Sequence, residues 1–235
     1  TRQSYILDHN DTTDQYQMDK LVLRREGADL ESVFLHVFEA FEKDQPQKIY
    51  SVERLYPIGC SSLDVVTKVT GEGFVDYVFS AYHDDLFVSI DGIDFKGQFG
   101  ALKIQHGKAV IAQAVSGKLC FKGAVLIETK RTTGNVLSAL SKGRNDAVNG
   151  FMIDSKLSKN VNDQFMVVYH PDQTTHAYRI KGSFLEDGKT IVDLGDMEPG
   201  FIIDKNRSSK MTHFPFIQWN GSTTIIIDEN GGVSY

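Results

Sequence analysis

Short hydrophobic runs separated by turn residues recur along most of the chain. From residue 49 onward, runs rich in Val, Ile, Phe, Tyr and Leu are interrupted by glycine-containing turns. Their spacing of about 8–12 residues is typical of the strands of a β-sandwich or barrel. Asp91-Gly92 and Asp187-Gly188 are hairpin signals, because these residue types accept the backbone conformations of a tight turn. The pattern predicts many short antiparallel strands.

The segment from residue 30 to residue 42 has two interpretations. Its apolar residues follow the spacing of an amphipathic helix, with Asp29 in the N-cap position. The part from Ser32 to Glu39 also alternates and is apolar on both faces, which is typical of a buried strand. Because the neighbouring segments have β patterns, we favour a strand that pairs with Ile49–Leu55 across the turn Lys43–Gln47.

A change in composition suggests a domain boundary. Residues 129–149 are polar and contain glycines, and β-branched runs resume afterwards at 164–169 and 223–228. We therefore predict an all-β protein, with an antiparallel β-sandwich in residues 1–130 and a smaller antiparallel β-sheet domain in residues 131–235.

The charge of the chain excludes some partners. Its 235 residues include 25 Lys and Arg against 31 Asp and Glu, a formal net charge of −6. A strongly basic stripe is missing, which argues against nucleic acid as a partner and against this chain being the main binding surface for a highly sulfated polyanion. No apolar run reaches the roughly 18 residues that a membrane span needs, so no membrane partner is expected. The chain starts at Thr1 without a signal-peptide pattern, and we interpret it as a piece of a longer protein.

The cysteines and histidines show no spacing typical of a metal site. Cys60 and Cys120 are far apart in sequence and form no Cys-x-x-Cys motif. Two free thiols are therefore expected, with a single disulfide as the alternative. His9 with Asp8 and Asp11 could form one corner of a metal site, but a solvated turn is the favoured interpretation. We expect no metal and no cofactor on this chain.

The sequence also lacks a complete active-site motif. Neither the nucleophile elbow Gly-x-Ser-x-Gly nor the phosphate-binding P-loop is present. Glu39 and Glu53 flank the expected hairpin and His36 lies within it, and we interpret them as parts of a sheet rather than as a general acid and base. No catalytic residue is assigned.

Four aromatic residues are candidates for contacting a sugar. The C–H faces of a sugar ring stack on exposed aromatic rings, while its hydroxyls bind polar side chains. The candidates are Trp219, Tyr56, Tyr82 and Tyr169. Trp219 precedes the turn Asn220-Gly221, where partial exposure would allow such a role, and core packing near a strand end is the favoured alternative.

Part of the sequence resembles a known enzyme family. Arg24-Arg25, the apolar run Ser32–Glu39 and the strand pattern Ser51–Leu55 follow one another between Leu21 and Pro57. This succession resembles the heparinase II/III-like polysaccharide lyases, in the β region that follows their catalytic helical domain. Ala40-Phe41 departs from the family, in which Pro and an aromatic residue usually follow the Glu. Looser similarity continues through Phe74–Val78, Gly97–Gly100, Leu119–Ile127 and Glu198–Phe201.

The resemblance implies a modular enzyme in which an N-terminal helical toroid is followed by antiparallel β-sheet domains. Such lyases cleave uronic-acid-containing polysaccharides by β-elimination, in which a base removes the C5 proton and an acid protonates the leaving oxygen. The family's catalytic Asn, Tyr and His belong to the toroid, and its metal-binding His and Asp lie early in the β region. None of them can be placed on this chain.

We therefore expect a non-catalytic C-terminal β module of a secreted or periplasmic polysaccharide lyase. Its partners would be an acidic polysaccharide and the N-terminal catalytic helical domain of the same parent protein, and any divalent metal would belong to that parent lyase. The alternative is a stand-alone carbohydrate-binding β-sandwich that uses Trp219 and the tyrosines. A third hypothesis is a complete small β-fold lyase or hydrolase.

Overall fold

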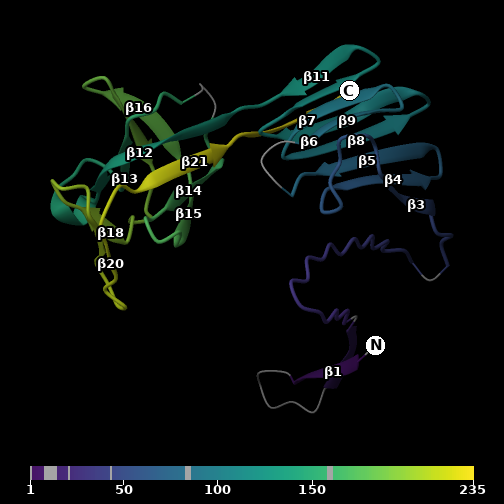
Figure 1. Cartoon of the computed structure of the whole chain (residues 1–235), viewed down its shortest axis with the longest axis horizontal. Coiled ribbons are helices and arrows are strands. Elements are labelled where there is room, and N and C mark those ends of the chain that lie inside the picture. The colour runs from purple at the N-terminus through teal and green to yellow at the C-terminus, as the bar shows by residue number, and fades with distance from the viewer. Residues whose placement is uncertain (1, 8–14, 21, 43, 83–85, 158–160) are drawn as a thin grey trace. The chain divides into compact units, whose positions relative to one another are not determined.

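The computed structural model describes residues 2–7, 15–20, 22–42, 44–82, 86–157 and 161–235. The chain divides into two compact units, residues 1–36 and residues 37–235. In the first unit, β1 (Arg2–Leu7) and β2 (Gln15–Lys20) form an antiparallel hairpin (Figure 1). The metal corner considered at His9 lies outside the described residues.

The prediction of an all-β fold is confirmed. The sheets of the described residues consist of antiparallel strand pairs, and the helical content of those residues is the single 3-10 turn η1 (Lys142–Arg144). None of the described helical segments has the length and apolar character needed to cross a membrane.

The second unit begins with a β-sandwich. One sheet has six strands in the order β22-β9-β8-β5-β4-β3, and the other has four in the order β11-β10-β7-β6. Side chains from both sheets form one hydrophobic cluster, in which the rings of Phe79 and Phe95 stack with centroids 5.0 Å apart. The strands are β3 (Ile49–Leu55), β4 (Val65–Gly71), β5 (Phe74–Ser80), β6 (Leu86–Ile90), β7 (Ile93–Gly97), β8 (Phe99–Gln105), β9 (Lys108–Val115), β10 (Lys118–Phe121), β11 (Ala124–Glu128) and β22 (Asn230–Ser234).

Side chains from two further sheets contribute to a second hydrophobic cluster. One sheet has seven strands in the order β15-β14-β21-β12-β13-β17-β16, and the other has three in the order β18-β19-β20. Phe151 packs edge-on against Tyr178 with ring centroids 5.0 Å apart. The strands are β12 (Arg131–Leu140), β13 (Gly150–Ile153), β14 (Phe165–Tyr169), β15 (Thr175–Arg179), β16 (Gly182–Glu186), β17 (Lys189–Asp193), β18 (Phe201–Ile203), β19 (Ser209–Met211), β20 (Gln218–Trp219) and β21 (Thr224–Asp228).

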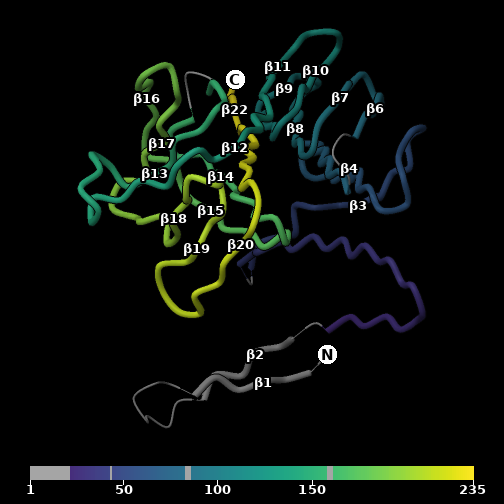
Figure 2. Tube along the Cα trace, turned by 60° about the vertical axis from the view of Figure 1, so that its left-hand side comes forward, coloured from purple at the N-terminus to yellow at the C-terminus, as the bar shows by residue number. Residues whose placement is uncertain are grey.

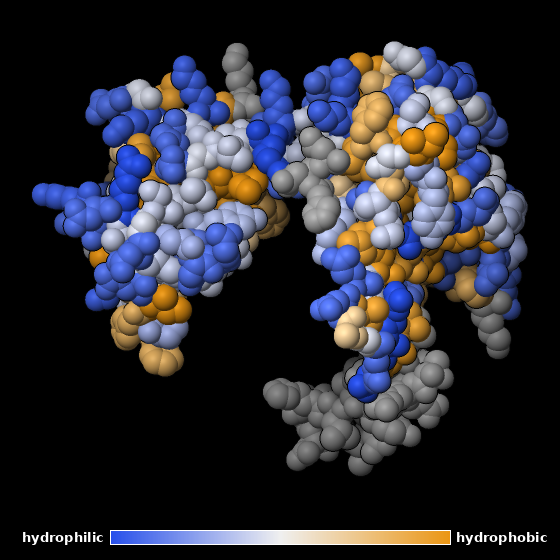
Figure 3. Space-filling model, viewed as in Figure 1, coloured by the Kyte–Doolittle hydropathy of each residue, from blue (hydrophilic) through white to orange (hydrophobic). Residues whose placement is uncertain are grey.

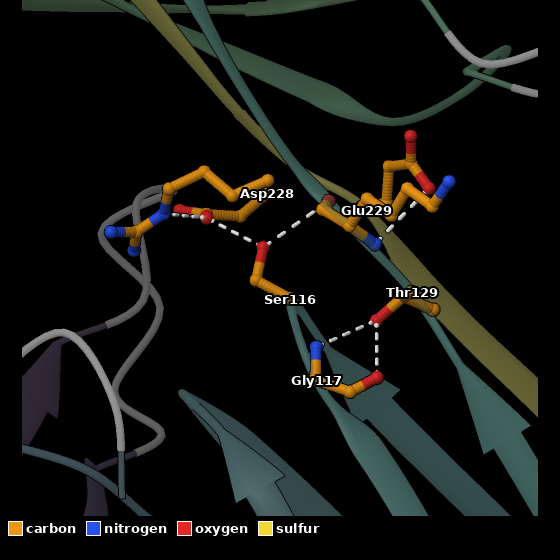
Figure 4. Close-up of polar contacts among 7 residues, drawn as sticks. Ser116, Gly117, Thr129, Asp228 and Glu229 are labelled. Atoms are coloured by element: carbon orange, nitrogen blue, oxygen red, sulfur yellow. Dashed lines mark hydrogen bonds and ion pairs between the residues drawn. The ribbon is translucent and has the colours of Figure 1, made fainter.

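Two strand-to-strand connections join the sandwich to the second core, because β12 directly follows β11 and β22 directly follows β21. The Asp228 carboxylate accepts hydrogen bonds from Ser116 Oγ and Arg131 Nε, both at 2.7 Å. Nearby, the Gly117 N–H donates to Thr129 Oγ1 at 3.0 Å (Figure 4). These polar contacts hold the connections against the β9–β10 turn.

The second unit contains two hydrophobic clusters, one with Phe121 and the other with Val136. At the C-terminal end, β22 returns to pair with β9 in the first sheet (Figure 2). Its Asn-Gly-Gly sequence resembles a turn, but Gly231 lies so close to the sandwich that an added Cβ would be 3.0 Å from Ile127 Cδ1. The glycine therefore permits close packing of an extended strand.

The predicted strand Ser32–Glu39 is not formed. Residues 22–42 contain neither helix nor strand, and β3 pairs with β4 alone at the edge of its sheet. The Glu39 carboxylate accepts hydrogen bonds from the backbone N–H of Lys48 at 2.6 Å and of Ile49 at 3.3 Å. A side chain thus binds the first amides of β3, where the predicted hairpin would have placed a neighbouring strand.

Candidate functional site

Two of the candidate tyrosines lie around one polar framework at the end of β3 and β5. Tyr56 follows β3 and is 70% exposed, and Tyr82 follows β5 and is 54% exposed. The Arg54 guanidinium lies 5.1 Å from the centroid of the Tyr56 ring, within the range of a cation–π interaction. We call Arg54, Tyr56, Asp64 and Tyr82 the tyrosine corner.

Hydrogen bonds from the Arg54 and Asp64 side chains to backbone groups hold the segments of this corner together. Arg54 donates through one terminal nitrogen to the carbonyl oxygens of Ser62 at 2.7 Å and Asp64 at 3.0 Å. The Asp64 carboxylate accepts from the backbone N–H of Ser61 at 2.8 Å and of Tyr82 at 2.9 Å. The framework therefore ties β3, the loop before β4 and the residue after β5 together, while both aromatic rings stay largely exposed.

The chemistry of the tyrosine corner suits a ligand with apolar faces and anionic groups. An exposed tyrosine ring offers an apolar face for C–H groups and a hydroxyl for hydrogen bonds. A guanidinium is the preferred partner of a carboxylate, because its N–H groups match the two oxygens. The groups of this corner that a ligand can reach include the two exposed tyrosine rings.

The other two candidates do not join this corner. Trp219, in β20, is only 3% exposed, and its ring stacks on His170 with centroids 3.7 Å apart and an interplanar angle of 8°. Its Nε1–H donates to Thr174 Oγ1 at 3.3 Å. Core packing therefore describes Trp219, and its ring offers no exposed face for a sugar. Tyr169 is half-buried in β14 of the seven-stranded sheet.

The tryptophan belongs to a buried polar cluster that the sequence pattern does not reveal. His170 Nε2 lies 3.0 Å from His176 Nδ1, and His170 Nδ1 lies 3.3 Å from Ser209 Oγ. Ser209 Oγ lies 3.1 Å from Thr223 Oγ1. Burial, with a contribution from the charge of His176, lowers the pKa of His170 to about 4, and burial also lowers the pKa of His176. Both rings are therefore neutral near neutral pH.

A serine beside a histidine can form a nucleophile and base pair, but only where a substrate can reach the hydroxyl. Ser209 is fully buried and His170 nearly so. The cluster therefore connects β14, β15, β19 and β20 as a structural network. The sequence positions 170, 176, 209 and 223 share no motif, so only the three-dimensional packing brings them together.

No group of three His, Cys, Asp or Glu side chains able to hold a metal occurs among the residues that the structure describes. Cys60 and Cys120 are both free and half-buried, so the alternative of a disulfide is not formed. Burial, together with the charge of Asp64, raises the pKa of the Cys60 thiol. This thiol is therefore less reactive than an exposed one.

Comparison of the chain with family models, with curated proteins and with solved structures found no match.

Proposed function

We propose that this chain is a non-catalytic β module of a polysaccharide lyase that cleaves uronic-acid-containing glycans by β-elimination. The module contacts the acidic polysaccharide through the tyrosine corner and supports the catalytic helical domain of the same secreted or periplasmic protein. The observation that carries the proposal is the pair of exposed tyrosines held around Arg54 and Asp64.

Exposed apolar surface supports a second contact, with another protein domain. Phe214 is 81% exposed, and Phe216 and Ile217 beside it are also exposed, in the turn between β19 and β20. Figure 3 shows hydrophobic residues at the end of the molecule where this turn lies in Figure 1. Grouped exposed apolar side chains mark interaction surfaces in soluble proteins. In the proposed parent lyase, this turn packs against the helical catalytic domain.

A stand-alone carbohydrate-binding β-sandwich is the second candidate, because the tyrosine corner would serve it equally well. The lyase module and the stand-alone binder predict different sequences upstream of Thr1 in the parent reading frame. A helical segment bearing Tyr, His and Asn upstream of Thr1 supports the lyase module, and a frame without one supports the stand-alone binder.

Calorimetric titration with alginate, hyaluronan, chondroitin sulfate and heparan sulfate oligosaccharides tests the glycan contact. At least one uronate glycan is expected to bind, and Tyr56→Ala with Tyr82→Ala is expected to weaken it about fivefold or more, because each lost ring contact contributes about 0.5–1.5 kcal/mol. Tyr235→Ala is the matched control, since Tyr235 is also an exposed tyrosine. Full affinity in the double variant, or cleavage of the glycan by the isolated chain, would contradict the proposal.

A further inference from the structure

His170 lies where the two sheets of the second core meet. It belongs to the turn between β14 and β15 of the seven-stranded sheet, and its ring contacts all three strands of the sheet β18-β19-β20. The ring stacks on Trp219 of β20, packs edge-on against Phe201 of β18 with centroids 4.8 Å apart, and lies 3.3 Å from Ser209 Oγ of β19. One buried side chain therefore joins the small sheet to the large one.

The three-stranded sheet depends on such side-chain contacts because its own strands are short. β18 and β19 have three residues each, and β20 has two. Strands of this length form few backbone hydrogen bonds, and a small sheet needs packing against the rest of the fold for its stability. The contacts at His170 therefore contribute directly to holding this sheet in place.

The contact between His170 and His176 limits how many protons this junction can hold. His170 Nε2 and His176 Nδ1 lie 3.0 Å apart, so one nitrogen donates its N–H and the other accepts with its lone pair. This hydrogen bond survives one added proton, because an imidazolium can donate to a neutral ring. A second added proton fills the remaining lone pair and places two positive charges side by side.

The titratable groups around the pair do not compensate for these charges. Burial and the charge of His176 lower the pKa of His170 to about 4, and the Asp172 carboxylate opposes them only in part. Burial lowers the pKa of His176, and the charge of His213 lowers it further. Burial raises the pKa of Tyr178, on the same strand as His176, so this phenol stays neutral. The closed junction therefore resists protonation.

We propose that His170 and His176 form a pH-sensitive switch that holds the sheet β18-β19-β20 closed at neutral pH and releases it on acidification. Release exposes both rings to water, where each accepts a proton with an ordinary pKa near 6.5. Acid therefore favours the open form. In that form Trp219 and Phe201 lose their cover, and the turn between β19 and β20, with Phe214, moves with its strands. The switch works independently of the proposed function.

The two pKa values of His170 give the size of the effect. A histidine with a pKa of about 4 in the closed form and 6.5 in the open form favours opening more strongly as the pH falls between these values. Between pH 7.5 and pH 5.0, His170 alone should raise the opening equilibrium constant about 30-fold. Uptake of a proton by His176 adds to this, so the pH dependence should be steeper than a single titrating group gives.

Hydrogen–deuterium exchange of the full chain at pH 7.5, 6.5, 5.5 and 5.0 tests the switch, with rates corrected for the intrinsic pH dependence of exchange. We expect residues 201–203 and 209–219 to lose protection by about 30-fold or more between pH 7.5 and pH 5.0. Strands β5 and β8 of the sandwich should keep their protection. The emission of Trp219, the single tryptophan, should shift to longer wavelength over the same pH range.

His176→Asn removes one titrating ring and keeps a group that can hydrogen-bond near the position of Nδ1. It should make the pH dependence shallower than in the wild type. His106→Asn is the matched control and should match the wild type, because His106 is exposed in a turn and Asn accepts its positive φ of 49°.

Two outcomes in the wild type alone overturn the switch, whether or not the variant folds. One is unchanged protection of residues 201–203 and 209–219 at pH 5.0, and the other is a simultaneous loss of protection in both cores. A wild-type pH dependence in a folded His176→Asn variant also overturns it.

Discussion

At the scale of single residues, the hydroxyl groups of two buried threonines are expected to affect stability in opposite directions. Thr67 Oγ1 has no hydrogen-bond partner in the described part of the chain, whereas Thr190 Oγ1 donates to the Ser155 carbonyl at 2.6 Å. Leaving a buried hydroxyl unpaired costs about 1–3 kcal/mol, and replacing it by a methyl group of similar shape removes that cost. The unpaired hydroxyl of Thr67 is therefore expected to lower the free energy of unfolding.

Thr67→Val should raise the free energy of unfolding by about 1 kcal/mol, and Thr190→Val should lower it by a similar amount. Urea unfolding followed by circular dichroism measures both values. Equal destabilisation by the two substitutions would contradict an unpaired Thr67 hydroxyl.

His170 gives a pH dependence with a defined sign. Its folded-state pKa of about 4 lies below the ordinary value of 6.5, so the folded protein binds fewer protons than the unfolded chain between these values. The free energy of unfolding should therefore fall as the pH decreases from 6.5 towards 4, by up to about 3 kcal/mol from this group.

His170→Gln should make this acid-side loss of stability shallower, and His106→Gln, at an exposed turn, should leave the slope unchanged. Urea unfolding at pH 7.5, 6.5, 5.5 and 4.5 gives the slopes. An identical slope in the His170 variant and the wild type would show that the buried histidine pair does not control acid stability.

At the scale of elements, the local sequence pattern predicts where many strands lie, but it does not predict which strands pair. Asp91-Gly92 and Asp187-Gly188 each form the turn that their sequence predicts, joining β6 to β7 and β16 to β17. The run Ser32–Glu39 has an equally good strand pattern, yet it forms no strand, and its Glu39 carboxylate instead accepts hydrogen bonds from the amides of Lys48 and Ile49. A strand needs a neighbour as well as a pattern, and single-sequence periodicity reports only the pattern.

The connection between the two cores supplies a prediction at this scale. Asp228 accepts from both Ser116 and Arg131, so Asp228→Ala should lower the free energy of unfolding by about 1–2 kcal/mol, since bonds to a charged group contribute more than neutral ones. It should also uncouple the cores. Trp219 is the single tryptophan and lies in the second core, so its fluorescence reports that core while circular dichroism reports all strands.

In the wild type, the fluorescence and circular dichroism transitions should coincide, and in Asp228→Ala they should separate. Asp163→Asn is the control, because it removes the charge from an exposed ion pair with Arg179 at 2.9 Å and Asn accepts the positive φ of this position. Coincident transitions in the Asp228 variant would contradict this prediction and would mean that the chain connections β11–β12 and β21–β22 couple the two cores without the Asp228 hydrogen bonds.

At the scale of the whole molecule, the all-β fold class could be predicted, because it follows from the spacing of the strands and from the turn residues between them. The tyrosine corner could be predicted only in part. The sequence predicts Tyr56 and Tyr82 as exposed aromatics, but the link between their backbone segments depends on hydrogen bonds of the Arg54 and Asp64 side chains to backbone groups. Trp219 is a candidate that the structure places in the core, where its ring stacks on His170.

The central proposal is that an acidic glycan binds at the tyrosine corner. Titrating the isotope-labelled chain with a uronate hexasaccharide and following its backbone amide signals by NMR tests this claim most directly. We predict that the amide signals of Arg54, Tyr56, Asp64 and Tyr82 shift together. Shifts confined to the second core around β12–β21, or no shift at saturating hexasaccharide, would contradict it.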